Sequence, residues 1–287
     1  MVIAPRLPYL VCATQRSGST LLCRLLSETG VAGHPQEYFE ATAETGRPPH
    51  PGDFLEGLGP TGAGIRDDVR PPKAPAYSSL QRLPDYRAHL ARTLAEGTGE
   101  NGVFGAKIMF NQIAEVHALT SRLPEYIGLH GAPLLQALTG TEQPLRYVWA
   151  RRSDTVRQAI SMWKAIQTRA WRGDEPGEHR RPRYHFDAID HLRARFEADE
   201  AGWERFFVAH GIEPLVVRYE ADLERDRVAT IRAVLRFIGV APPAQLVAEA
   251  PLVRQADALT EEWVATYHRD RAERGRSAVV PVGAPRR

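Results

Sequence analysis

A polar segment near the amino terminus carries the residue types that bind phosphate. Residues 13–20 have the sequence ATQRSGST and follow an apolar run over residues 9–13. In the phosphate-loop pattern G-x-x-x-x-G-K-S/T, the last glycine and the hydroxyl residue match at Gly18 and Thr20. Backbone N–H groups in such a turn, with the positive end of the following helix dipole, attract an anion. The segment predicts a phosphate site, and the alternative is a polar turn without a ligand.

Two departures from the pattern restrict the anion. Ala13 stands where the first glycine would be, and Ser19 replaces the lysine that reaches the terminal phosphates of a nucleoside triphosphate. Arg16 supplies positive charge instead, and no acidic residue suited to magnesium is obvious at the later strand ends. We therefore predict a site for a 5′-linked phosphate without a polyphosphate tail and without a metal ion.

The elements that must position this loop predict an α/β fold. Apolar runs indicate strands at residues 9–13, 103–109, 145–150 and 214–218. Apolar residues at helical spacing indicate a helix that ends at Gly30 and further helices at residues 77–95, 154–170, 186–209, 221–238 and 263–274. Residues 30–76 and 171–183 are interpreted as irregular. Strands that alternate with helices imply a mainly parallel central sheet flanked by helices on both faces.

Composition excludes several classes of protein. The 287 residues carry a formal net charge of only +2, unlike a dedicated nucleic-acid binder. The abundance of arginine over lysine is typical of a GC-rich genome, such as an actinobacterial one. Cys12 and Cys23 are interpreted as buried small hydrophobic residues, and no signal peptide or membrane-spanning run is evident. We predict a cytoplasmic protein with one domain over residues 1–275 and a flexible tail over residues 276–287.

Four longer stretches together resemble the Stf-zero type of bacterial sulfotransferase. They are QRSGSTLL, GVAGHPQEYF, GAKIMFNQ and RRSDTVRQAISMWKAIQTRAWRG, and the resemblance extends from about residue 9 to residue 271. It implies a P-loop-like fold in three layers and the donor 3′-phosphoadenylyl sulfate. It further implies attack by a hydroxyl of a trehalose-like sugar or glycosylated metabolite, release of adenosine 3′,5′-bisphosphate, and a homodimer.

The resemblance also implies which residues bind the donor. Arg152 and Ser161 would hold the 3′-phosphate, and Arg254 lies in a stretch that would close over the nucleotide. Read alone, Arg152 would form a surface salt bridge and Ser161 would be an ordinary helix serine. The 5′-phosphosulfate would lie against the phosphate loop, formed by Gln15, Arg16, Ser17, Gly18, Ser19 and Thr20.

Glu37 matches the general base of the family. An alcohol that attacks sulfur must lose its proton in or near the transition state, and a carboxylate can accept it. Arg16 and the loop amides would stabilise the leaving phosphate, with Lys107 as a second cation. Without the resemblance, a lone glutamate in a proline-containing loop is usually only solvated.

The resemblance also implies an acceptor site. A tryptophan face with polar neighbours suits a sugar ring, although Trp171 could equally pack into the core. His34 stands where a family member has a glutamate, so the identity of the acceptor stays open. The residues implied are His34, Gln36, Glu37, Gln167, Trp171 and Arg172.

Two other functions fit the same segment. A small-molecule kinase with a degenerate phosphate loop would need ATP and magnesium, which the missing lysine disfavours. A non-catalytic nucleotide-binding protein would not need Glu37.

Overall fold

The central element of the fold is a parallel sheet of four strands in the order β2–β1–β3–β4. The computed structural model describes residues 5–39, 54–55, 57–58, 65, 86–171, 181–246 and 258–278. The strands are β1 (Leu7–Ala13), β2 (Val103–Met109), β3 (Arg146–Arg151) and β4 (Leu215–Arg218). All pairings between them are parallel. The four predicted strands and the parallel sheet are confirmed.

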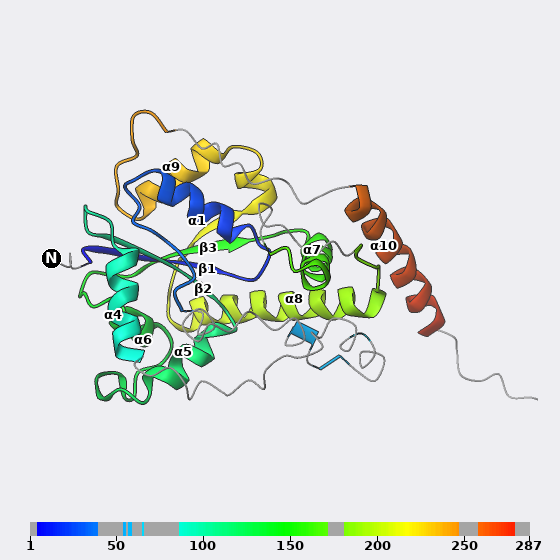
Figure 1. Ribbon diagram of the computed structural model, residues 1–287, viewed down its shortest axis with the longest axis horizontal. Helices are drawn as coiled ribbons and strands as arrows, with labels where there is room; N and C mark the ends of the chain where they lie inside the picture. Colours follow the sequence, from blue (N-terminus) through cyan, green and yellow to red (C-terminus); the bar gives the residue numbers. More distant parts are fainter. Residues whose placement is uncertain are drawn as a thin grey trace, which may run out of the picture.

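Helices cover both faces of this sheet, which gives the predicted three layers (Figure 1). One face packs against α1 (Ser19–Glu28) and α9 (Arg227–Phe237). The other packs against α4 (Tyr86–Gly97), α5 (Gln112–Thr120), α6 (Gly131–Ala137) and the carboxyl-terminal part of α8 (Phe186–Ala209). Residues of β1 alternate between the two cores, with Val11 facing α1 and Leu10 facing α8. Because both faces are buried, the strands are almost entirely apolar.

A third core lies beyond the carboxyl ends of the strands. It joins α7 (Thr155–Thr168), the amino-terminal part of α8 and α10 (Ala258–Ala278). Arg157 of α7 forms ion pairs with Asp154 and with Glu261 of α10. This core fixes α7 next to the strand ends where the phosphate loop lies (Figure 1).

Several predicted helix bounds are wrong. The helix predicted at residues 221–238 is a π-helical turn, Tyr219–Leu223, followed by α9. Acidic side chains interrupt it, because Asp222 accepts a hydrogen bond from the Arg218 N–H and Asp226 caps α9 at the Ala229 N–H. Neither α5 nor α6 was predicted. The helix predicted at 77–95 is described from residue 86, as α4.

The ends of the chain leave two predictions open. Helix α10 begins before its predicted start and continues to Ala278, and residues 279–287 lie outside the described part. The single domain and the tail therefore stay predictions. Most of the segment at residues 30–76, which was predicted to be irregular, also lies outside the described part of the chain.

Cys12 and Cys23 are buried free thiols, as predicted. Within the described residues, no helix has the length and apolar character needed to cross a membrane.

Candidate active site

The phosphate loop connects the end of β1 to α1 through two left-handed residues. Arg16 has φ 63° and Gly18 has φ 88°. Gly18 is the N-cap of α1 and provides no side-chain cap, and the first N–H groups of a helix have no intrahelical partner. These N–H groups and the helix dipole provide a site for an anion at this end of α1.

Gly18 and Ser17 are both constrained by their surroundings, Gly18 by packing and Ser17 by burial of its hydroxyl. A Cβ atom on Gly18 would lie 2.4 Å from Cδ2 of Tyr219, so only glycine fits under that ring. The Ser17 side chain is only 1% exposed. Its Oγ has no hydrogen-bond partner within the described residues. A buried hydroxyl without a partner costs about 1–3 kcal/mol, which hydrogen bonding to a bound phosphate would offset.

Buried polar residues hold the start of the loop. The Thr14 hydroxyl donates to Glu200 Oε1 at 3.2 Å and accepts from Gln158 Nε2 at 2.9 Å. Gln158 also donates to the Gln15 carbonyl, at 2.6 Å. Burial raises the pKa of Glu200, although Arg151 Nε, 2.7 Å from Oε2, opposes the rise. The loop is therefore fixed to α7 and α8 before any ligand binds.

Glu37 lies on the β2 side of the loop and is held by two donors. Lys107 Nζ is 2.7 Å from Glu37 Oε2, and Gln112 Nε2 donates to Oε1 at 2.9 Å. The same ammonium group donates to Thr20 Oγ1 at 3.2 Å, in the first turn of α1. The main chain brings these residues together, because the Lys107 N–H donates to the Gln36 carbonyl at 2.8 Å. The Glu37 carboxylate is thus connected to the phosphate loop through the Lys107 side chain.

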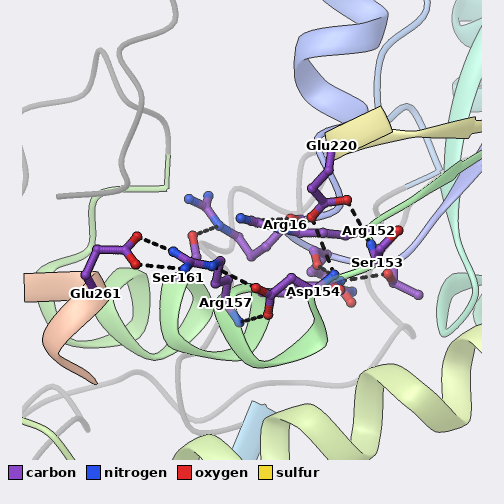
Figure 2. A network of polar contacts seen from close by, with 11 residues as sticks. Arg16, Arg152, Ser153, Asp154, Arg157, Ser161, Glu220 and Glu261 are labelled. Atoms are coloured by element: carbon purple, nitrogen blue, oxygen red, sulfur yellow. Dashed lines mark hydrogen bonds and ion pairs between the residues drawn. The ribbon is translucent and has the colours of Figure 1, made fainter. Parts of the chain in front are cut away.

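Arginines lie on the opposite, α7 side of the loop (Figure 2). Arg16 Nε donates to Ser161 Oγ at 3.0 Å, and an Arg16 guanidinium nitrogen donates to the Trp171 carbonyl. Arg152 Nη1 is 3.4 Å from the Arg16 carbonyl, and its Nε is 3.3 Å from Glu220 Oε1. Arg152 also lines a cavity at the ends of β3 and β4. Two guanidinium groups and a hydroxyl suit a dianionic phosphate.

Comparison with known proteins decides the family. The model of the Stf0 sulphotransferase family matches residues 8–270. The chain belongs to this family. The sulfotransferase is 36% identical over 266 residues to a protein named trehalose 2-sulfotransferase from Mycobacterium tuberculosis (strain ATCC 35801 / TMC 107 / Erdman), covering 91% of this chain and 94% of that protein. It is also 36% identical over 274 residues to a protein of the same name from Mycolicibacterium smegmatis, with the same shares covered.

These findings confirm the resemblance on which the site was predicted. They establish a sulfotransferase with a P-loop-like α/β fold. Among the residues that the structure describes, no group of three or more His, Cys, Asp or Glu side chains could hold a metal ion.

The predicted acceptor residues of the sulfotransferase lie in two places. His34 is exposed next to Gln36 and Glu37, and its N–H donates to the Gly97 carbonyl at 3.1 Å. Gln167 instead forms two hydrogen bonds with the main chain of Arg183. It donates to the carbonyl at 3.1 Å and accepts from the N–H at 2.8 Å. This amide therefore holds the main chain shortly before α8.

Trp171 is half-buried in the third core. Its ring is 6.0 Å from that of Phe54, so the packing alternative describes at least part of its role. Its carbonyl contacts Arg16, which places it on the α7 side of the loop. Arg172 and Arg254 lie outside the described residues.

Sequence reasoning missed several residues around the loop. Gln112 contacts Glu37, and Asn111 accepts from Gln15 Nε2 at 2.9 Å. Both end the stretch GAKIMFNQ, so the resemblance was a signal that could have found them. Gln158 likewise lies in the quoted stretch RRSDTVRQAISMWKAIQTRAWRG, whereas Glu200 lies within α8, outside the quoted stretches, and had no comparable signal.

Proposed function

We propose that this sulfotransferase transfers the sulfuryl group of 3′-phosphoadenylyl sulfate to a hydroxyl of a sugar or glycosylated metabolite, with Glu37 as general base. The observation that carries the proposal is the contact chain from Glu37 through Lys107 to Thr20. It puts a proton acceptor beside an anion site, as in-line transfer from a phosphate-linked donor requires.

The loop fits the 5′ end of such a donor. The 5′-phosphosulfate would bind to the N–H groups at the start of α1 and to the hydroxyl groups of Ser17, Ser19 and Thr20. Of these hydroxyl groups, that of Ser17 is buried and has no hydrogen-bond partner within the described residues. Arg152 and Ser161 would bind the 3′-phosphate, with Arg254 closing over the nucleotide. The separation of Arg152 and Ser161 from Glu37 by the loop supports this orientation of the donor.

The transfer is a displacement at sulfur. The acceptor oxygen forms a bond to sulfur while the bond from sulfur to the bridging phosphate oxygen breaks, and the bridging oxygen keeps the electron pair. Glu37 takes the proton of the acceptor hydroxyl, a role worth about 10²–10⁴ in rate. The loop amides, Arg16 and Lys107 stabilise the charge that develops on the leaving phosphate.

The names of the two relatives make trehalose the first acceptor to test. His34, Gln36, Gln167, Trp171 and Arg172 remain the candidate residues for its recognition. A glycosylated metabolite stays open as an acceptor, because Gln167 and Trp171 make contacts within the protein. We retain the prediction of a homodimer from the family resemblance and that of a cytoplasmic location from the composition.

Mass spectrometry of the purified protein with labelled donor tests the proposal. Trehalose, other disaccharides and glycosylated metabolites form the acceptor panel, and the Glu37→Gln variant forms the comparison. We expect a sulfated sugar from the wild-type protein and a rate lower by about 10²–10⁴ from the variant. Phosphoryl transfer from ATP and magnesium would favour the kinase alternative. Absence of transfer to every acceptor, or an unchanged rate in the variant, would contradict the proposal.

A further inference from the structure

Gln112 is a buried polar residue whose contacts are directed at Glu37. It is the first residue of α5, directly after β2, and is only 5% exposed. Resting on the proposed function, we infer that Gln112 is the positioning residue of the general base. It fixes the Glu37 carboxylate next to the phosphate loop.

The orientation of the Gln112 amide follows from its partners. Gln112 Oε1 accepts from the Met109 main-chain N–H at 2.9 Å. An N–H group can only donate, so the oxygen of the amide must face Met109 and its NH₂ group must face the other side. That side holds Glu37 Oε1, 2.9 Å from Nε2. The end of β2 therefore sets which group of Gln112 meets the carboxylate.

Gln112 and Lys107 together hold both oxygens of Glu37. Lys107 Nζ contacts Oε2 and Gln112 Nε2 contacts Oε1. Each carboxylate oxygen has about two acceptor positions, so the two contacts leave room for an acceptor hydroxyl. Two donors on one partly buried carboxylate restrict its rotation.

The neighbours of Gln112 connect this arrangement to the phosphate loop. The Phe110 N–H donates to the Ala13 carbonyl at 3.2 Å, at the end of β1. Asn111 Oδ1 accepts from Gln15 Nε2. Three consecutive residues after β2 thus contact β1, the loop and Glu37 in turn. A shift of Gln112 would move the base relative to the donor site.

The Gln112→Met variant tests the inference, because methionine keeps the length of the side chain and removes both hydrogen-bonding groups. A hydrogen bond to a charged group contributes enough that kcat should fall about ten- to hundredfold. The KM for the donor should stay within about twofold, because Gln112 does not contact the donor site directly.

Gln136 provides a matched control on α6. Its Oε1 accepts from the Leu145 N–H at 2.8 Å and its Nε2 donates to the Thr141 carbonyl at 2.9 Å. Like Gln112, Gln136 accepts from a main-chain N–H and donates through its NH₂ group, but it precedes β3 rather than following a strand. Gln136→Met should change stability but neither kcat nor the KM for the donor.

A double variant separates positioning from a general structural role. If Gln112 acts through Glu37, adding Gln112→Met to Glu37→Gln should lower kcat no further than Glu37→Gln does alone. Additive losses would overturn the inference. If Gln112→Met does not fold, Gln112→Glu keeps an acceptor for the Met109 N–H and places a negative charge beside Glu37. It should lower kcat, and a wild-type kcat would overturn the inference.

The same measurements distinguish this inference from the proposed function. A wild-type protein that transfers no sulfuryl group, or a fully active Glu37→Gln variant, refutes the proposed function. An active wild-type protein with an impaired Glu37→Gln variant and an unaffected Gln112→Met variant refutes only the role of Gln112.

Discussion

Gly18→Ala is the smallest change that should disable the phosphate loop. The backbone at Gly18 has φ 88°, and an added Cβ would lie 2.4 Å from Tyr219 Cδ2. The side chain must therefore tolerate a left-handed backbone and displace an aromatic ring. Both effects act at the N-cap residue of α1.

The two costs can be taken separately. A left-handed conformation costs an alanine about 1–2 kcal/mol. Displacement of a packed ring costs about 1–3 kcal/mol more. We expect Gly18→Ala to lower the free energy of unfolding by about 2–5 kcal/mol. If the loop shifts to relieve the overlap and loses one hydrogen bond to the phosphate, affinity for adenosine 3′,5′-bisphosphate should fall about tenfold or more.

Gly30→Ala is the matched control at the other end of α1. Gly30 has φ 69°, but no atom lies within 4 Å of its added Cβ. In this variant the free energy of unfolding should fall only by the cost of a left-handed alanine, about 1–2 kcal/mol. The variant should bind the bisphosphate with wild-type affinity. Urea unfolding measures the stability of both variants, and titration calorimetry measures their affinity.

A second substitution tests the cause. Tyr219→Ala removes the ring from above Gly18, so Gly18→Ala should cost less in the Tyr219→Ala background than in the wild-type protein. Arg152 lies 5.0 Å from the centroid of this ring, so the Tyr219→Ala variant alone is the reference for binding. Wild-type affinity in Gly18→Ala, or equal losses in Gly18→Ala and Gly30→Ala, would refute this reasoning.

Three further predictions concern binding, metal and pH. Arg16→Ala and Arg152→Ala should each weaken bisphosphate binding in calorimetry, since each removes a guanidinium group from the α7 side of the loop, and retained affinity in both would contradict the donor site. Transfer should continue in EDTA, because the loop lacks the lysine that acts with magnesium on a triphosphate, and strict loss of activity with chelator would count against this. Burial raises the pKa of Glu200, so its protonated form stabilises the fold below the unfolded pKa, and that contribution is lost as pH rises through the folded pKa. The stability of Glu200→Gln relative to wild type, measured by urea unfolding, should therefore rise as pH increases above about 4, whereas a fall would show that the ionised carboxylate is stabilised overall.

Local patterns made the sheet and the loop predictable from sequence. The apolar run before Thr14, the glycine at position 18 and the leucines of α1 specify a strand, a turn and a helix without reference to the rest of the chain. Helix α8 was predicted with its observed limits for the same reason. The π-helical turn after β4 was not, because Asp222 and Asp226 have acceptors that compete with helical hydrogen bonds.

The surroundings of Glu37 depend on contacts between distant segments. Lys107 reaches Glu37 because its main chain pairs with Gln36 beside β2, and no periodicity in the sequence specifies that pairing. The family resemblance could indicate Glu37 and Lys107 but not their direct contact. It assigned Arg16 and Ser161 to different phosphates of the donor without indicating that the two side chains contact each other.

A crystal structure with adenosine 3′,5′-bisphosphate is the most direct test of the account. We predict that its 5′-phosphate accepts hydrogen bonds from the N–H groups at residues 17–20 and lies on the side of the loop that faces Glu37. A bisphosphate bound elsewhere, or a 5′-phosphate turned away from Glu37, would contradict the assignment of both the donor site and the base.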